Sequence, residues 1–270
     1  MQITFYKYQG TGNDFIMIDD RTLSFPIDDV ELIKKWCDRR FGIGADGLIL
    51  LQPHSTAAYY MKYYNSDGRE SSMCGNGGRC LAAFALTIGV VNGPHEFMAV
   101  DGLHQATPLI IEGKPLQIKL KMKDVDEVKK LDSTNFELNT GSPHYVEFIE
   151  EDVHTIPLVE MAKTIRYNKT YKKEGINVNM VNAITPQHLI MRTYERGVED
   201  ETFSCGTGVT AAALSSIIHA KLQPGEHHIQ IKTPGGELEV SAVLQATSDN
   251  FSDIWLTGPA TFVFKGSVEI

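Results

Sequence analysis

The sequence has few cysteines and no long apolar run. Its 270 residues include four cysteines, Cys37, Cys74, Cys80 and Cys205, which is too few for a disulfide scaffold. No apolar stretch approaches the roughly 18 residues that a membrane span needs, so no membrane partner is expected. The first residues lack the basic start and apolar stretch of a signal peptide. These absences predict a cytoplasmic protein whose thiols are free to react.

Positive charge is also scarce. Lys and Arg number 25 against 34 Asp and Glu, which gives a net charge of −9. Without a basic stripe, nucleic acid is not an expected partner. No Cys-x-x-Cys pair or His/Cys cluster has the spacing of zinc ligands, so no metal site is predicted.

Short apolar runs dominate the chain. Runs such as ITFYKY, GLILLQ, INVNMV and HLIMRTY are rich in Val, Ile, Tyr and Phe and are bounded by Gly, Pro, Asn or Asp, which is typical of strands. Residues 28–40 and 157–167 have the pattern of amphipathic surface helices, and Pro157 lies near the first turn of the second. The segments that follow Cys74 and Cys205 are Ala-rich and apolar on nearly every side, which indicates helices enclosed by other elements.

The two Cys-containing regions are similar to each other. At an offset of 205 − 74 = 131 residues, YYNSDGRESSMCGNGGRCLAAFAL (63–86) lies on TYERGVEDETFSCGTGVTAAALSS (193–216) from Tyr194 onward. Both copies read as a strand, an acidic turn, a Cys-Gly-x-Gly step and an enclosed helix. The repeat predicts two similar domains, each with many strands around one helix.

A Cys-Gly-x-Gly step at a helix start favours chemistry on a carboxylate. The first turn of a helix leaves about four N–H groups unpaired and carries roughly half a positive charge. Glycine lets a ligand approach the backbone closely, so a carboxylate can bind there. At the same place the thiolate form of a cysteine is favoured, since thiol pKa values of about 3.5–7.5 occur in such settings, against about 8.5 for a free cysteine.

Two such steps facing one another would make a two-base epimerase. Both helix starts could bind one carboxylate and stabilise the negative charge that builds on it. The Cys74 and Cys205 sulfurs would flank the adjacent carbon, one removing the proton as thiolate and the other returning one as thiol. Cys37 and Cys80 are predicted to be packing residues instead.

Three other functions remain open at this point. A racemase of proline or hydroxyproline could use the same two thiols. A Cys-His acyl-transfer enzyme could pair Cys205 or Cys74 with His144, although it would leave the repeat unexplained. A binding protein without activity would have no need of either cysteine.

The motifs in their order resemble those of the diaminopimelate epimerase family. GTGNDF (10–15), FGIGADG (41–47), YYNSDG (63–68) with MCGNGGRC (73–80), GSPHYV (141–146) and YERGVEDETFSCGTG (194–208) cover nearly the whole chain. The resemblance implies interconversion of L,L- and meso-2,6-diaminoheptanedioate, a small-molecule substrate, in the synthesis of lysine and of peptidoglycan precursors. It implies no pyridoxal phosphate, no metal and no other cofactor.

The resemblance also implies an α+β fold of two pseudo-symmetric domains. Each would be a mainly antiparallel sheet wrapped around a central buried helix, with the active site in the cleft between them. Residues 1–114 with 257–270 would form the N-terminal domain, which carries Cys74. Residues 115–256 would form the C-terminal domain, which carries Cys205. A homodimer is expected because dimers are common in the family.

At the reacting end of the substrate, the resemblance implies residues from both copies. Asn13 would line this end, and His144 and Glu195 would tune the sulfurs of Cys74 and Cys205. The backbone N–H groups that would bind the reacting carboxylate are those of Gly75, Asn76, Gly206 and Thr207.

At the far end of the substrate, the resemblance implies Asn65, Asn177, Glu195 and Arg196. A zwitterionic amino-acid group needs an anion for its ammonium and a cation for its carboxylate, and the adjacent Glu195 and Arg196 supply one each. Asn65 and Arg196 both precede their cysteine by nine residues. This spacing predicts equivalent positions for them in the repeat.

The sequence departs from the family pattern at three places. Gly47 stands where many members have Gln, and Ser142 stands where many have Asn. The turn after Arg196 contains Val198 and Glu199, followed by Asp200 and Glu201. This turn is expected to bring negative charge close to Cys205.

Overall fold

The structure, a computed structural model, describes residues 2–71, 73–246 and 249–269. The chain forms two compact units, Met1–Leu120 with Gly258–Ile270 and Lys121–Thr257. The predicted boundaries at 114/115 and 256/257 lie within 120 − 114 = 6 residues of these divisions. Among the described residues, no helix is both long and apolar enough to cross a membrane.

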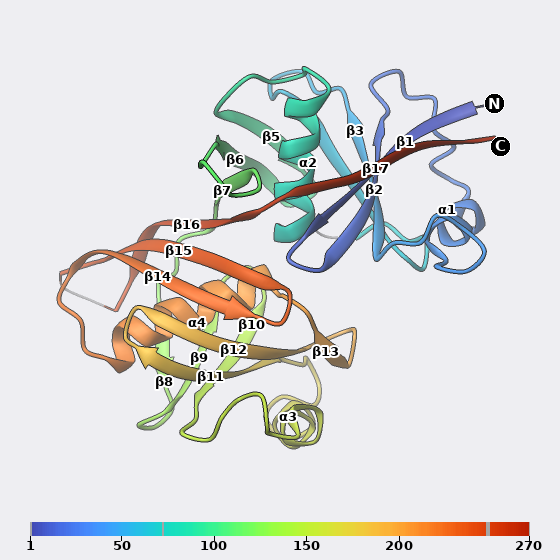
Figure 1. Cartoon of the computed structure of the whole chain (residues 1–270). Coiled ribbons are helices and arrows are strands. Elements are labelled where there is room, and N and C mark those ends of the chain that lie inside the picture. The colour runs from blue at the N-terminus through green and yellow to red at the C-terminus, as the bar shows by residue number, and fades with distance from the viewer. Residues whose placement is uncertain (1, 72, 247–248, 270) are drawn as a thin grey trace. The chain divides into compact units, whose positions relative to one another are not determined.

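The first unit is a sheet in the order β17-β1-β2-β3-β4-β5-β6-β7 (Figure 1). Neighbouring strands are antiparallel, except that β2–β3 and β4–β5 are parallel. Its strands are β1 (Gln2–Gly10), β2 (Asn13–Asp19), β3 (Gly47–Gln52), β4 (Tyr60–Asn65), β5 (His95–Ala99), β6 (Gly102–Leu109), β7 (Gln117–Lys121) and β17 (Thr261–Glu269).

The helix α2 (Gly75–Thr87) is enclosed by this sheet. Every residue from Asn76 to Ala85 is buried, as the apolar pattern on all its sides predicts. The helix approaches the strands closely because Gly77 has no side chain: a Cβ there would lie 2.9 Å from Ile49 Cδ1. Gly89, with a φ of +72°, follows the helix end, where a left-handed residue is favourable.

The second unit has the same order of strand pairing. Its sheet runs β8-β9-β10-β11-β12-β14-β15-β16 and is antiparallel except at β10–β11 and β12–β14, while the short β13 pairs with the end of β12. Its strands are β8 (Val128–Lys130), β9 (Asn135–Asn139), β10 (Pro143–Phe148), β11 (Asn177–Thr185), β12 (His188–Glu195), β13 (Asp200–Thr202), β14 (Gly225–Thr233), β15 (Gly236–Leu244) and β16 (Phe251–Pro259).

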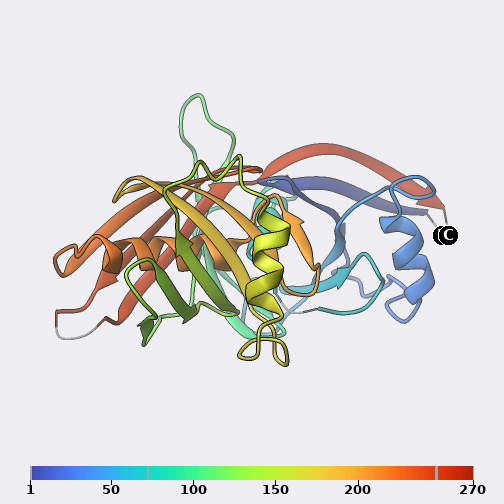
Figure 2. The same cartoon turned by 90° about the horizontal axis from the view of Figure 1, so that it is seen from below.

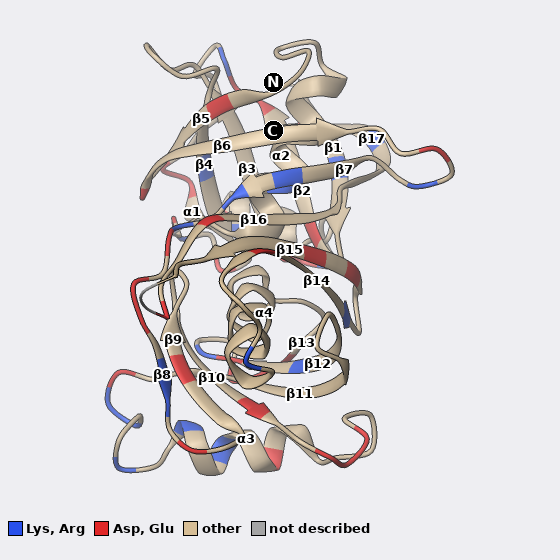
Figure 3. Cartoon of the chain, turned by 90° about the vertical axis from the view of Figure 1, so that its left-hand side faces the viewer, with Lys and Arg blue, Asp and Glu red and all other residues tan. Residues whose placement is uncertain are grey.

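The helix α4 (Gly206–His219) is enclosed in turn by these strands, which surround it in Figure 3. Its residues from Val209 to Ile217 are all buried. They pack in a core with inward-facing strand residues such as Phe136, Met191 and Val240. Each such large side chain stabilises the unit by about 1.5–3 kcal/mol.

The two remaining helices cover outer faces of the sheets. The helix α1 (Val30–Cys37) begins where the Asp29 carboxylate accepts a hydrogen bond from the Leu32 N–H, and it buries Ile33 and Trp36. The helix α3 (Leu158–Arg166) follows Pro157 and packs outside β11 and β12 (Figure 2). Both helices were predicted, although each is shorter than its predicted range.

The predicted fold class is confirmed, because each unit is a sheet wrapped around one buried helix. The pairing senses follow the same order in both units. In each unit an outer helix connects the first two parallel-paired strands, and an enclosed helix lies between the next two. Each sheet is mainly antiparallel, as predicted, and contains two parallel pairs.

The alignment of the two repeat copies differs by one residue between their strands and their helices. Glu70 bridges to Tyr64, whereas Glu201 pairs with Tyr194, so Tyr194 corresponds to Tyr64 rather than to Tyr63. The turn of the second unit contains one more residue. The predicted equivalence of Asn65 and Arg196 is therefore wrong: Asn65 ends β4, and the residue that ends β12 is Glu195.

Candidate active-site halves

Cys74 occupies the N-cap position of α2. Its backbone is extended (φ −104°, ψ 126°), and its side chain makes no capping hydrogen bond. Its carbonyl accepts the first helical bond, from the Gly78 N–H at 2.7 Å. The N–H groups of the first turn, which begins at Gly75 and Asn76, therefore have no acceptor within the helix. They concentrate the positive end of its dipole beside the sulfur.

Asn13, the first residue of β2, contacts the Cys74 thiol. Its Oδ1 lies 3.6 Å from Cys74 Sγ and 3.4 Å from Asn76 Nδ2. Its Nδ2 donates to the Asp46 carboxylate at 2.7 Å. A carboxylate can only accept, so the amide nitrogen of Asn13 must lie on that side. The carbonyl of Asn13 is consequently the atom presented to the thiol.

Asp46 belongs to an ionic network that includes Asp14. Arg39 donates to both Asp14 oxygens and to Asp46, and Lys7 forms an ion pair with Asp14 at 2.8 Å. Burial raises the pKa of Asp14, but hydrogen bonds from Arg39 and Lys7 outweigh it and bring this pKa to about 2. Asp14 is thus ionised at neutral pH, and the network holds the side chain of Asn13 through Asp46.

Arg79 lies one turn into α2 and is fully buried. Its Nη2 donates to Asn76 Oδ1 at 2.9 Å and to Thr11 Oγ1 at 3.2 Å. Within the described part of the chain, its Nε and Nη1 have no hydrogen-bond partner. Burial lowers the pKa of this guanidinium, while attraction to the Cys80 and Cys74 sulfurs opposes that effect. Because an arginine side chain keeps its proton in proteins at neutral pH, a positive charge is held beneath the Cys74 helix start.

Cys205 has the corresponding place in the second unit. It is the N-cap residue of α4, with an extended backbone (φ −117°, ψ 111°) and no side-chain capping bond. Its carbonyl accepts from the Val209 N–H at 2.8 Å. Its sulfur lies 3.4 Å from Thr207 Oγ1. Gly206 and Thr207 provide the first N–H groups of the helix, as Gly75 and Asn76 do in the first unit.

A buried polar cluster lies below the Cys205 helix start. His144 Nε2 is 2.9 Å from Thr207 Oγ1, and His144 Nδ1 is 3.2 Å from Asn179 Nδ2. Asn179 also donates to the Tyr145 carbonyl at 2.9 Å and accepts from the Thr193 hydroxyl at 3.0 Å. Burial, with a smaller contribution from Arg196, lowers the pKa of His144 to about 3. The imidazole is therefore neutral at pH 7.

The predicted far-end residues of the second unit form another set of contacts. Asn177, at the start of β11, donates to Ser142 Oγ at 2.8 Å and to the Pro143 carbonyl at 3.0 Å. Its Oδ1 accepts the backbone N–H of Arg196 at 2.9 Å, which positions that residue just beyond Glu195, the end of β12. The structure thus brings Asn177, Glu195 and Arg196 together at one strand end.

Two sequence departures have structural explanations. A Cβ at Gly47 would lie 2.5 Å from Tyr63 Cε2, so glycine there makes room for the tyrosine ring. The carboxylate of Glu199 is engaged with Arg166 at 2.8 Å and with the Tyr167 hydroxyl at 2.8 Å. Glu201 pairs with Arg192 at 2.6 Å. The carboxylates of Glu199 and Glu201 are therefore each paired with an arginine.

The other two thiols differ from Cys74 and Cys205. Cys37 and Cys80 are buried, and burial raises the pKa of each to about 12. Such thiols remain protonated and unreactive at neutral pH. Among the described residues, no group of His, Cys, Asp or Glu could hold a metal ion.

Sequence reasoning missed four residues of these clusters: Arg79, Asp46, Asn179 and Thr193. Arg79 is a charged residue in an otherwise apolar helix, and this could have marked it. Asn179 and Thr193 occupy inward-facing strand positions, where a polar residue is unusual. Apart from its place in the FGIGADG motif, nothing in the sequence marked Asp46 as a residue of the site.

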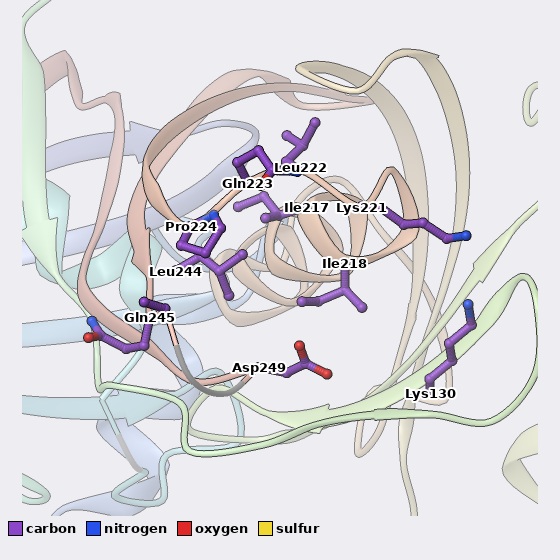
Figure 4. Close-up of a pocket in the computed structure, with 11 residues that line it drawn as sticks. Lys130, Ile217, Ile218, Lys221, Leu222, Gln223, Pro224, Leu244, Gln245 and Asp249 are labelled. Carbon is purple, nitrogen blue, oxygen red and sulfur yellow. The ribbon is translucent and has the colours of Figure 1, made fainter.

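A cavity of about 590 Å³ opens at the C-terminal end of α4 (Figure 4). Ile217, Leu222 and Leu244 line it, together with charged residues such as Lys130 and Asp249. It lies at the opposite end of the helix from Cys205. None of the predicted site residues lines it.

The fold of the chain is shared with solved structures. A Bacillus anthracis phenazine biosynthesis protein of the PhzF family has a similar structure, with a TM-score of 0.76 at 14% identity over 100% of both chains. A probable proline racemase from Agrobacterium radiobacter has a TM-score of 0.67 at 15% identity, covering 99% of this chain and 93% of that one. At this low identity the likeness concerns the fold alone.

The family follows from the sequence. The diaminopimelate epimerase family profile matches residues 5–114 and 136–263. A diaminopimelate epimerase of Flavobacterium psychrophilum is 49% identical over 97% of this chain and 99% of its own. One of Chlorobaculum tepidum is 37% identical, also over 97% and 99%. The chain belongs to the diaminopimelate epimerase family, which confirms the resemblance.

Proposed function

We propose that this protein is an isomerase that interconverts L,L- and meso-2,6-diaminoheptanedioate. The observation that carries the proposal is the duplicated site: each unit has a cysteine at the N-cap of its enclosed helix. The curated relatives bear the name of this activity. A proline or hydroxyproline racemase is less favoured, because its substrate lacks the second amino-acid group that Glu195 and Arg196 suit.

In the proposed reaction, Cys74 and Cys205 act on opposite faces of one α-carbon. The thiolate of one removes the α-proton and becomes a thiol. The electron pair left on carbon delocalises into the adjacent carboxylate, which the N–H groups of Gly75, Asn76, Gly206 and Thr207 stabilise. The thiol of the other gives its proton to the opposite face and becomes a thiolate. The centre is inverted, and the roles reverse for the return reaction.

The far amino-acid group is proposed to bind at the strand ends. Arg196 would bind the carboxylate in two places, and Glu195 would bind the ammonium. Asn177 supports this arrangement, since it already accepts the Arg196 N–H. Asn65, at the end of β4, would contribute from the other unit.

The contacts of His144 disfavour an acyl-transfer enzyme based on Cys205. Its Nε2 lies against Thr207 Oγ1, and a pKa of about 3 makes the ring a poor base at neutral pH. We propose instead that it tunes the Cys205 sulfur through Thr207. The proposal requires no cofactor. From the membership of the family we further propose a cytoplasmic homodimer.

Incubation with L,L-diaminoheptanedioate in deuterated water tests the function. Deuterium should enter one α-carbon as the meso isomer appears, and Cys74→Ala and Cys205→Ala should each abolish turnover. Wild-type protein with L-proline is the specificity control. Epimerisation by the Cys205→Ala protein at the wild-type rate would exclude the two-thiol mechanism, and activity on proline alone would identify the rival.

A further inference from the structure

The hydrogen bonds below α4 have a fixed direction. The Tyr145 carbonyl can only accept, so the atom of Asn179 that faces it at 2.9 Å must be the amide nitrogen. The Thr193 hydroxyl at 3.0 Å from the amide oxygen agrees with this orientation. The same nitrogen faces His144 Nδ1 at 3.2 Å. Since an amide nitrogen can only donate, Nδ1 must be the acceptor.

This direction determines the tautomer of His144. A neutral imidazole has one donor and one acceptor nitrogen, and the bond at one nitrogen sets the other. With Nδ1 accepting, the proton is on Nε2, which donates to Thr207 Oγ1 at 2.9 Å. The neutral state is consistent with complete burial of the ring. The Thr207 oxygen thereby accepts from His144, and its own proton is available to the Cys205 sulfur at 3.4 Å.

We propose that Asn179 is a positioning residue that orients the His144–Thr207 pair so that Thr207 donates a hydrogen bond to the Cys205 sulfur and favours its thiolate. Hydrogen bonding to the charged form of a group lowers its pKa. The inference deepens the proposed function and relies on it for the role of that thiolate in turnover. The close approach of the cluster explains Gly208, where a Cβ would lie 2.6 Å from Asn179 Oδ1.

Charged groups also stand at the strand ends beside this cluster. Arg196, beyond β12, acts on His144 from a distance, and Glu195 ends the same strand. Glu201 on β13 is paired with Arg192. The first turn of α4 contains no acidic residue. The Thr207 hydroxyl is in direct contact with the Cys205 sulfur, at 3.4 Å.

The thiol pKa of Cys205 tests the proposal without substrate. In a Cys74→Ala background, the pH dependence of iodoacetamide alkylation reports the thiolate of Cys205. Thr207→Val removes the hydroxyl at constant shape and should raise this pKa by about one unit. Thr210→Val is the matched control, because that hydroxyl bonds to the Gly206 carbonyl at 3.0 Å and should leave the pKa unchanged. An unchanged pKa in Thr207→Val would overturn the proposal.

Two further measurements concern Asn179 itself. Asn179→Leu should raise the Cys205 pKa. Adding Thr207→Val should raise it no further, because both substitutions act through the same series of hydrogen bonds. Nitrogen-15 NMR of histidine-labelled protein, with the His144 signal assigned from a His144→Gln variant, should show the Nε2–H tautomer. An Nδ1–H tautomer would refute the proposal even if Asn179→Leu fails to fold. None of these outcomes depends on epimerase activity, so they separate this inference from the proposed function.

Discussion

The two helix starts have the same backbone and different surroundings. Below α2 the glycine contact is apolar: a Cβ at Gly77 would meet Ile49, Met61 and Phe15. Below α4 it is polar: a Cβ at Gly208 would meet Asn179 and His144. One turn further along, the first unit buries Arg79 where the second has Thr210, whose hydroxyl bonds back to Gly206.

Under the proposed mechanism, one fold would favour a thiolate in two ways. At Cys74 the Asn13 carbonyl accepts from the thiol and favours the protonated form, while the buried charge of Arg79 favours the thiolate. At Cys205 the neutral, hydrogen-bonded series Asn179–His144–Thr207 would provide a hydroxyl donor instead. A reversible two-base reaction requires thiols of similar acidity. Duplicated units can satisfy that requirement with unrelated residues, provided that the surrounding groups shift the two thiol pKa values by similar amounts.

The largest expected effect comes from adding a methyl group at the two equivalent glycines. Gly208→Ala would force the methyl against Asn179 Oδ1, which three hydrogen bonds around that amide hold in place. Displacement of the cluster should lower kcat/KM about a hundredfold. Gly77→Ala meets the flexible ends of Ile49 and Met61 and should lower it only about tenfold. Steady-state kinetics of both variants check this.

Thermal unfolding provides the control for both glycine variants. Alanine is the better helix former by about 0.5–1 kcal/mol, so a loss of activity in a protein that still unfolds cooperatively reports on the site. We expect the apolar side chains near Gly77 to adapt to the methyl group and the hydrogen-bonded cluster near Gly208 to resist it. A larger activity loss in Gly77→Ala than in Gly208→Ala would contradict this comparison.

The next effect concerns the buried charge. Arg79→Met should raise the pKa of the Cys74 thiol by about one unit and lower turnover at neutral pH about tenfold, because the positive charge that favours the thiolate is lost. Part of the rate should return at higher pH. Alkylation of Cys74 in a Cys205→Ala background measures the thiol directly. Arg79→Lys keeps the charge and should recover part of the effect; an unaltered thiol pKa in Arg79→Met would disprove this role.

Much of the fold could be predicted because its signals are local. The enclosed helices after Cys74 and Cys205 are apolar on all sides, and short alternating runs mark the strands. The register of the repeat could not be read this way. One additional residue in the turn near Glu199 shifts β12 relative to α4, and a fixed offset from the cysteines cannot locate such an insertion.

The polar cluster below α4 was also beyond sequence reasoning. Asn179 reads as one polar residue in a strand. Its partners, Tyr145 and Thr193, lie 34 and 14 residues away in the sequence, and only the parallel pairing of β10 with β11 brings the first of them close. The motif around His144 identified the histidine but not what holds it. Catalytic types can be recognised locally, whereas the residues that orient them depend on tertiary pairing.

The smallest effect concerns the acid stability of the two units. His144 has a folded pKa of about 3, below its unfolded value of 6.5, so the unfolded chain binds its proton first. The stability that this neutral histidine contributes is complete above pH 6.5 and is lost as the pH falls toward 3, by at most about 1.4 kcal/mol per pH unit. In the first unit, Asp14 has a pKa of about 2 against 3.8. Its contribution is lost only between about pH 4 and 2.

The second unit should therefore weaken first as the pH falls from 6.5 to 4. The two tryptophans allow the units to be followed separately, since Trp36 is in α1 of the first unit and Trp255 is in β16 of the second. In Trp36→Phe and Trp255→Phe proteins, urea unfolding followed by fluorescence should show a steeper pH dependence for Trp255. Burial also lowers the pKa of His95 in the first unit, so the difference must disappear when His144→Gln is added. If it persists in that variant, another group causes it.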